Sequence, residues 1–214
     1  MPSLLKEYAE FFRQFRARYE TTGAILPSSR FLARALTRPL ALHTRPVRIL
    51  EVGPGTGPVT RRIVGLMRPE DRLDLVELND QFVAILRDRL DSEPQFRAVA
   101  EQTRLHHCPI QEFRADKPYD FIISGLPLNN FSPELVEEIF DCFFRLLAPE
   151  GVLSYFEYMF LRAVRMRVGR RNERQRLRGV DQVVSRYLSR YRFRRDWVFC
   201  NVPPAWVQHL RRDG

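Results

Sequence analysis

The chain has 214 residues, of which 44% are hydrophobic and 29% charged, which suits one well-buried domain better than two independent ones. Its formal net charge is +9, and Lys6 and Lys117 are the only lysines, so arginine supplies nearly all the positive charge. Arginine binds phosphate through paired hydrogen bonds, which favours a phosphate-rich partner, either nucleic acid or an anionic membrane. A genomic bias toward arginine codons would explain the same composition.

The cysteines and the distribution of apolar residues exclude several classes of protein. Cys108, Cys142 and Cys200 lie far apart, without the spacing of metal ligands or of a disulfide framework. We therefore predict no metal site and a reducing, cytoplasmic location. The sequence shows no secretory leader and no run of 18 apolar residues, so we expect neither export nor a membrane span.

Residues 2–20 place apolar side chains at helical spacing and predict an amphipathic helix with one wide aromatic face. The face comprises Leu4, Leu5, Tyr8, Phe11, Phe12, Phe15 and Tyr19. Two roles stay open, because such a helix can pack on the domain or lie in a membrane interface with its arginines at the lipid phosphates. After a turn-rich connector, Ser28 or Ser29 is expected to cap a second helix over residues 30–42.

The strongest local signal is a strand that ends in a glycine turn. Residues 47–52 are apolar and largely β-branched, and Pro58 stands where a helix over 59–67 would begin. Between them the glycines recur at alternate positions, as Gly53, Gly55 and Gly57. Glycine permits positive φ and lets the backbone approach a ligand closely. The stretch Leu50-Glu51-Val52-Gly53-Pro54-Gly55-Thr56-Gly57 resembles motif I of the class I S-adenosylmethionine-dependent methyltransferases.

Two acidic residues accompany this turn. Glu51 lies within the end of the first strand, and Glu77 closes the next strand, over residues 73–78. A carboxylate at the latter position can accept two hydrogen bonds from the hydroxyls of a ribose. The spacing also differs from the G-x-G-x-x-G of nicotinamide sites, so the pattern favours a nucleoside ligand without a pyrophosphate. A plain strand-to-helix turn would explain the glycines, but not the acids.

Strands and helices continue to alternate, as in a doubly wound α/β domain. We expect helices at residues 80–90 (capped by Asn79), 96–101 and 133–147 (capped by Ser132). We expect strands at residues 104–107, 119–124 and 152–158. Residues 160–188 are helical in pattern but strongly basic, with breaks expected near Gly169 and Gly179.

Residues 193–201 and 205–210 predict an antiparallel hairpin. The fold class is therefore α/β: a class I methyltransferase (Rossmann-like) seven-stranded sheet with an antiparallel last hairpin, plus N-terminal amphipathic helices. We divide the chain into residues 1–45, which would face membrane or substrate, and residues 46–214, the methyltransferase domain, with a basic insertion at about 160–190.

The turn after the fourth strand offers a place for the methyl acceptor. Its carbonyls could hold an amine with the lone pair aimed at a sulfonium methyl, although a plain turn would look alike. Enzymes that methylate N6 of adenine in RNA place a polar residue, a proline and an aromatic here, and the aromatic stacks the flipped base. This chain has Gly125, Pro127 and Leu128, so an adenine acceptor is disfavoured and no nucleic-acid partner is expected.

Three further motifs resemble the bacterial phospholipid N-methyltransferases. They are Thr22-Gly23-Ala24-Ile25-Leu26-Pro27-Ser28-Ser29, Ser124-Gly125-Leu126-Pro127 and Asn201-Val202-Pro203-Pro204-Ala205. The resemblance implies S-adenosylmethionine as cofactor and one to three N-methylations of phosphatidylethanolamine toward phosphatidylcholine. It also implies a peripheral enzyme on the cytoplasmic face of the inner membrane, bound to anionic phospholipid.

The resemblance and the strand ends together give the candidate binding residues. For the cofactor they are Glu51, Gly53, Pro54, Gly55, Thr56, Gly57, Glu77, Leu78, Pro109, Ile110, Ser124 and Gly125. For the lipid substrate they are Leu126, Asn129, Arg165 and Arg167. The carboxylate that many class I enzymes place near Pro109 is missing, so the backbone around Ile110, or the side chain of Gln111, would contact the adenine amino group.

Glu157, Tyr158 and Tyr19 are the candidate catalytic residues. Glu157 and Tyr158 could hold and deprotonate the amine at the end of the fifth strand, and Tyr19 could offer a hydroxyl or cation–π contact. For lipid phosphate we expect the arginines at 162, 165, 167, 170, 171, 174, 176 and 178, in what is otherwise a solvated surface helix. An RNA methyltransferase and a non-catalytic, cofactor-binding membrane scaffold remain the alternatives, and the oligomeric state stays open.

Overall fold

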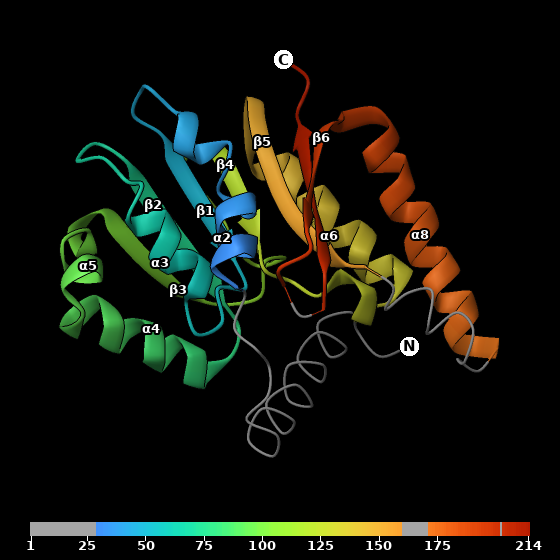
Figure 1. Ribbon diagram of the computed structural model, residues 1–214, viewed down its shortest axis with the longest axis horizontal. Coiled ribbons are helices and arrows are strands. Elements are labelled where there is room, and N and C mark those ends of the chain that lie inside the picture. The colour runs from blue at the N-terminus through green and yellow to red at the C-terminus, as the bar shows by residue number, and fades with distance from the viewer. Residues whose placement is uncertain (1–28, 160–170, 202) are drawn as a thin grey trace.

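The computed structural model describes residues 29–159, 171–201 and 203–214, and its centre is one seven-stranded sheet (Figure 1). The strand order is β3-β2-β1-β4-β5-β7-β6. The strands are β1 (Arg48–Val52), β2 (Arg72–Glu77), β3 (Thr103–His107), β4 (Tyr119–Ser124), β5 (Leu147–Tyr158), β6 (Arg192–Val198) and β7 (Ala205–Arg211). Strands β1 to β5 pair in parallel, whereas β7 is antiparallel to both β5 and β6. The predicted fold class, including the antiparallel last hairpin, is confirmed.

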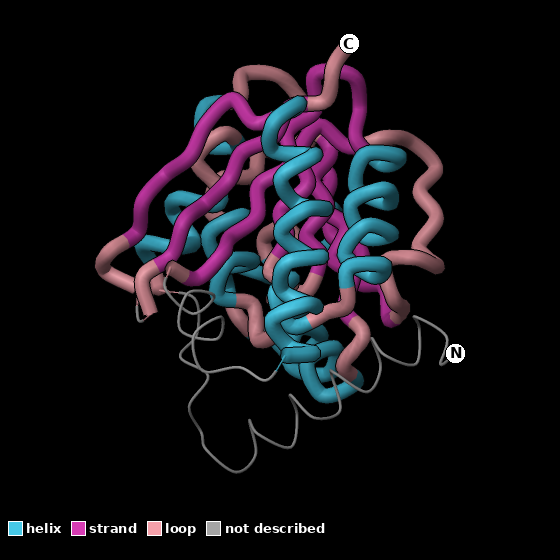
Figure 2. The backbone as a smooth tube through the Cα atoms, turned by 90° about the vertical axis from the view of Figure 1, so that its right-hand side faces the viewer, coloured by secondary structure: helices cyan, strands magenta, loops and turns pink. Residues whose placement is uncertain are grey.

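Helices cover both faces of the sheet (Figures 1 and 2). They are α2 (Arg30–Leu36), α3 (Pro58–Val64), α4 (Asp80–Ser92), α5 (Pro94–Arg97), α6 (Pro133–Leu146) and α8 (Arg171–Tyr191), with 3₁₀ turns at Leu40–Leu42, Ala100–Gln102 and Leu128–Asn130. None of the helices in the described part of the chain is both long and apolar enough to cross a membrane.

Strand alternation divides the core into two clusters, one on each face. Leu50 and Tyr155 point toward α6 and α8 and belong to the larger cluster. Ile49 and Phe156, one position away on the same strands, pack with α2 and α3 on the other face. Leu32, Leu36 and Leu40 lie in this second cluster, so the segment that begins at α2 packs into the core of the domain.

Most of the predicted caps are present, because short polar side chains satisfy the free N–H groups of the first helical turn. Ser29 Oγ accepts from Leu32 N, Asn79 Oδ1 from Gln81 N and Phe82 N, and Ser132 Oγ from Leu135 N. The second helix is shorter than predicted, since α2 ends at Leu36 and only a 3₁₀ turn follows.

The break predicted near Gly179 is wrong, because α8 runs through it. Gly179 faces the start of α6, where a Cβ at this position would lie 2.5 Å from Pro133 Cγ. The glycine therefore serves close packing of two helices rather than a turn. The break predicted near Gly169 and the helix predicted at 2–20 lie outside the described residues.

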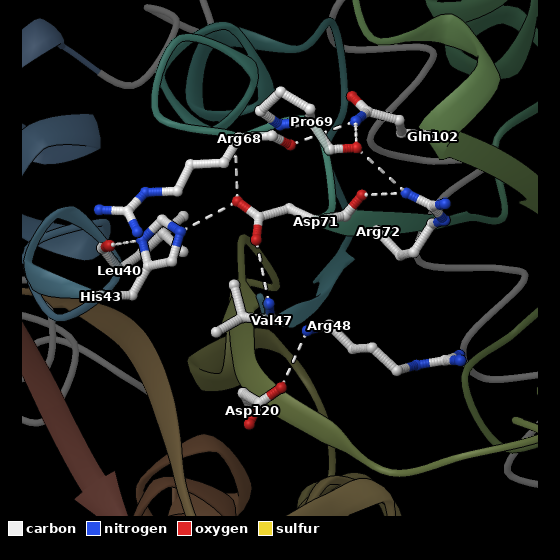
Figure 3. A network of polar contacts seen from close by, with 10 residues as sticks. All are labelled: Leu40, His43, Val47, Arg48, Arg68, Pro69, Asp71, Arg72, Gln102 and Asp120. Carbon is white, nitrogen blue, oxygen red and sulfur yellow. Dashed lines mark hydrogen bonds and ion pairs between the residues drawn. The ribbon is translucent and has the colours of Figure 1, made fainter. Parts of the chain in front are cut away.

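At the amino-terminal edge of the parallel strands, the buried Asp71 carboxylate is fully engaged (Figure 3). Its Oδ1 accepts from Val47 N at 2.9 Å, and its Oδ2 accepts from Arg68 N at 2.8 Å. His43 Nε2 lies 2.9 Å from Oδ2, and its Nδ1 lies 2.6 Å from Leu40 O. The network joins the 3₁₀ turn that follows α2 to the starts of β1 and β2.

Candidate active site at the carboxyl ends of the strands

The sheet reverses its order between β1 and β4, which lie side by side although two strands separate them in sequence. In open α/β sheets, ligands bind at the carboxyl ends of the strands, at such a switch point. The glycine turn follows β1, and the segment Ser124–Phe131 follows β4, so both predicted loops lie at this edge.

The glycine turn requires glycine at all three positions. Gly53, Gly55 and Gly57 have φ values of 68°, 58° and 82°, in the left-handed region that other residues rarely adopt. Gly53 N donates to Val76 O at 2.9 Å, which ties the turn to β2. Gly57 precedes Pro58, the first residue of α3, so the turn leads directly into a helix N-terminus, as predicted.

The turn after β4 lies against the glycine turn. Gly125 N donates to Val52 O at 2.8 Å, and a Cβ on Gly125 would collide with the carbonyl oxygen of Gly53. A Cβ on Gly53 would in turn lie 2.7 Å from Leu126 Cδ2. The two backbones therefore touch, and the absence of a side chain at Gly125 is a steric requirement.

Glu77 holds the glycine turn from the end of β2. Its Oε2 accepts from Gly55 N at 3.0 Å, and its Oε1 accepts from Leu78 N and Asn79 N at 2.9 Å each. Burial raises the pKa of this carboxyl, while the three N–H donors oppose the rise. Because a carboxylate oxygen has two lone pairs, Oε2 can still accept a hydrogen bond from a ligand hydroxyl.

Buried polar atoms of Glu51, Thr60 and Gln111, near the carboxyl ends of the strands, lack hydrogen-bond partners among the described residues. Glu51 is 1% exposed, and its Oε2 makes no hydrogen bond there. Gln111 is 8% exposed, and neither its Oε1 nor its Nε2 is bonded. Burial raises the pKa of Glu51 to about 8, with the Thr60 hydroxyl opposing the rise and Glu77 adding to it. Unpaired buried polar groups are rare, and each calls for an explanation such as an absent ligand.

The remaining predicted cofactor residues lie along the same edge. Pro54 and Thr56 are part of the glycine turn, where Gly57 N donates to Pro54 O at 3.0 Å. Leu78 follows Glu77 and is partly buried. The carbonyl of Pro109 accepts a hydrogen bond from Glu112 N, and Ile110 is fully buried. Ser124 Oγ accepts from Leu126 N.

The predicted substrate residues are placed only in part. Leu126 is buried against Gly53, and Asn129 lies in the 3₁₀ turn after β4. Arg176 Nη1 donates to the carbonyls of Asn129 and Phe131, at 3.0 and 2.6 Å. We expected Arg176 to bind lipid phosphate, and the structure shows that it holds the turn after β4 in place. No signal in the sequence connected these segments. Arg165, Arg167 and Tyr19 lie outside the described residues.

Glu157 and Tyr158 point to opposite faces of the sheet, because β5 continues through Tyr158. Glu157 is buried on the α8 side, where its Oε2 accepts from Gln208 Nε2 at 3.2 Å. Tyr158 packs on the α2 side against Phe156, with ring centroids 5.1 Å apart, and burial raises its pKa. A single amine can therefore reach only one of the two side chains directly.

Residues 49–151 match the family described as "Methyltransferase domain". The structure is similar to that of the N-methyltransferase NodS from Bradyrhizobium japonicum in complex with S-adenosyl-l-homocysteine. The match covers 95% of this chain and 98% of that chain, with a TM-score of 0.66 at 15% identity. The strand order and this structural match show that the chain has the class I methyltransferase fold.

Two curated methyltransferases resemble this chain in sequence. The ornithine lipid N-methyltransferase of Singulisphaera acidiphila is 29% identical over 155 residues, which cover 72% of this chain and 80% of that protein. The ribosomal RNA small subunit methyltransferase A of Marinobacter nauticus is 29% identical over 129 residues, covering 60% of this chain and 42% of that protein.

Proposed function

We propose that the protein is an S-adenosylmethionine-dependent N-methyltransferase whose substrates are membrane lipids with an amine in the headgroup. Phosphatidylethanolamine and its methylated derivatives, en route to phosphatidylcholine, are the first candidate. Ornithine lipid is the second, since it is the substrate named for one relative. The observation that carries the proposal is the glycine turn, with unbonded buried polar atoms of Glu51 and Gln111 at the same edge of the sheet, in a chain that resembles a lipid N-methyltransferase over most of its length.

The hydrogen-bonding groups at the carboxyl edge of the sheet are suited to binding S-adenosylmethionine. Glu77 Oε2 has a lone pair left for a ribose hydroxyl, and the bare backbone from Gly53 to Gly57 leaves room for close approach. Gln111 can both donate to and accept from an adenine edge, which would satisfy its two unbonded amide atoms. The carboxylate of Glu51, next to the turn, would be stabilised by a positively charged group of the ligand.

S-adenosylmethionine supplies an electrophilic methyl group when bound, and the protein has to present a neutral amine to it in line. An alkylamine has a pKa of about 10, so the ammonium must lose a proton before transfer. Alignment in the cleft supplies most of the rate. Within the chain, Arg176 fixes the turn from Asn129 to Phe131 and thereby the carbonyls that would orient the amine.

Glu157, Tyr158 and Tyr19 remain the proposed residues for holding and deprotonating the amine. Glu157→Gln and Tyr158→Phe distinguish the two strand residues, because they face opposite sides of β5. The variant that removes the proton acceptor should lower kcat and shift the pH–rate profile, whereas the other should leave the profile unchanged.

The test of the function is transfer of a radiolabelled methyl group from S-adenosylmethionine. The acceptors are vesicles of phosphatidylethanolamine, vesicles of ornithine lipid, and total RNA, with the content of anionic lipid varied. We expect label in lipid and none in RNA. Label in RNA alone would overturn the proposal, and turnover of neither would favour the non-catalytic scaffold.

An RNA methyltransferase is the second candidate, because a ribosomal RNA enzyme is among the relatives. The residue that would stack a flipped base is Leu128 in this chain, and its side chain is buried in the core. It offers neither a ring nor an open surface to a base, which weighs against RNA.

A further inference from the structure

Three exposed aromatic residues lie at the start of α2 and around the end of β6, two elements that pack together. Phe31 is 40% exposed, Trp197 56% and Phe199 66%. The rings of Trp197 and Phe199 stack on each other, with centroids 5.8 Å apart. A gathered set of exposed aromatic rings on a soluble domain usually marks an interaction surface.

Arginines surround these rings. Arg34, Arg38 and Arg62 line, with the three aromatic residues, a hollow of about 570 Å³ between α2, α3 and the end of β6. The only acid among its lining residues is Asp196, which is neutralised by ion pairs with Arg194 at 2.8 Å and with Arg38 at 3.5 Å. We call the surface formed by Phe31, Trp197, Phe199, Arg34 and Arg62 the aromatic–arginine face.

The aromatic–arginine face lies at the same edge of the sheet as the candidate active site. Strand β6 runs antiparallel to β7, which runs antiparallel to β5, so β6 ends at the edge where β5 and the other parallel strands end. The start of α2 is held at this edge as well, because Ser29 N donates to Asn201 Oδ1 at 3.1 Å. A partner bound here would lie at the same edge of the sheet as the glycine turn.

We propose that the aromatic–arginine face docks the domain on an anionic phospholipid surface. Tryptophan and phenylalanine favour the headgroup level of a bilayer, and arginines beside them can reach lipid phosphate while their stems lie along apolar surface. The inference rests on the proposed function, because docking at this edge would bring lipid amines to the glycine turn. A nucleic acid is the other occupant that the arginines could bind, and it is distinguished by the tests below.

The first test measures sedimentation of the full-length protein with vesicles of phosphatidylethanolamine, with and without phosphatidylglycerol. The variant is Phe31→Ala/Trp197→Ala/Phe199→Ala. The matched control is Leu42→Ala/Phe193→Ala, which removes the other two exposed large hydrophobics among the described residues. We expect the triple variant to lower the partition coefficient about tenfold or more, and the control to leave it within about twofold.

The charge on the face is tested separately with Arg34→Glu/Arg62→Glu. This variant should lose binding to vesicles with phosphatidylglycerol and change little on vesicles without it, and salt should diminish the difference. Equal loss on both kinds of vesicle would remove the electrostatic part of the proposal.

Fluorescence of Trp197 gives a readout independent of activity. In a Trp206→Phe background Trp197 is the only tryptophan. Its emission should shift to shorter wavelength on anionic vesicles and be quenched by lipids brominated near the headgroup. No shift while the protein sediments with the vesicles would place the contact elsewhere and overturn the proposal.

Other occupants of the face give different results. If a segment of the chain itself covers it, the triple variant should lower Tm and leave vesicle binding unchanged, which overturns the proposal. The same holds if the variant loses binding of total RNA but not of vesicles. If the wild type binds vesicles through this face yet methylates no lipid, docking stands and the proposed function fails. If it methylates lipid and the triple variant binds normally, the function stands and docking fails.

Discussion

The two edges of the sheet differ in how completely certain buried polar side chains are hydrogen-bonded. At the amino-terminal edge, Asp71 is fully buried, and each of its oxygens accepts a backbone hydrogen bond, with His43 as a further neighbour (Figure 3). At the carboxyl edge, Glu51 and Gln111 are about as deeply buried but have oxygen or nitrogen atoms without a partner among the described residues.

The difference separates groups that stabilise the fold from groups that await a ligand. A buried carboxylate that accepts several hydrogen bonds fixes the elements that supply them, whereas an unbonded one lowers stability until something binds. We propose that Glu77 combines both, because it holds Gly55, Leu78 and Asn79 and keeps a lone pair available to a ligand. Four substitutions test this division, beginning with the one of largest effect.

Asp71→Ala should lower the free energy of unfolding by about 3–5 kcal/mol, because it leaves two buried N–H groups and His43 without their acceptor. Urea denaturation measures this loss, and the affinity for S-adenosylmethionine should change little in the fraction that is folded. Asp120→Ala is the control at the same edge. It removes a half-buried acceptor of Arg48 N and should cost about 1–2 kcal/mol. Equal losses of unfolding free energy would mean that the Asp71 network stabilises the fold no more than the half-buried Asp120 does.

Glu77→Ala should weaken the binding of S-adenosylmethionine about 100-fold, or about 2.7 kcal/mol, since it removes the ribose acceptor and frees the Gly55 end of the turn. Titration calorimetry measures the change. Asp88→Ala removes the same charge from the exposed side of α4 and should bind the cofactor normally. Unchanged affinity in Glu77→Ala would show that the ribose lies elsewhere.

Glu51→Gln should flatten the dependence of stability on pH. The pKa of Glu51 is raised from 4.5 to about 8 in the folded protein, so the folded state holds a proton that the unfolded state releases. The wild type should therefore lose up to about 5 kcal/mol of stability as the pH rises from 4.5 through 8. Urea denaturation at several pH values should show that loss in the wild type and much less in the variant. Parallel curves would mean that Glu51 is paired in solution.

Gln111→Leu should have the smallest effect on the stability of the protein without cofactor, and it should weaken cofactor binding. Removing an unbonded amide from a buried site should leave the free energy of unfolding unchanged or raise it slightly. Affinity for S-adenosylmethionine should fall about tenfold if the amide contacts adenine. A clear loss of stability with normal affinity would instead give Gln111 a structural role.

Much of the fold could be predicted because its signals are local. The glycine turn, the caps Asn79 and Ser132, and the hairpin around residues 203–204 each depend on residues within a few positions of one another. The order of elements then restricts the sheet to few topologies. The candidate site is placed at the carboxyl edge by the same signals, because strands end where glycines and acids begin.

The rest depended on contacts between distant segments. The sequence could not show that Arg176 holds the Asn129 turn, since 47 positions separate them. Nor could it show on which side of β5 Glu157 and Tyr158 lie, because that depends on where the strand ends. The unpaired state of Gln111 is likewise a property of its surroundings and not of its neighbours in sequence.

The contact between Gly179 and Pro133 restricts how this protein can vary in length. One inserted or deleted residue within α8 rotates the rest of the helix by about 100° about its axis. A residue other than glycine would then face Pro133, where there is no room for a Cβ atom. Related chains that keep this helix pair should therefore differ in loop length while α8 keeps its phase between residue 179 and the hairpin that follows. Changes of length inside the helix should occur only together with loss of the α6 proline.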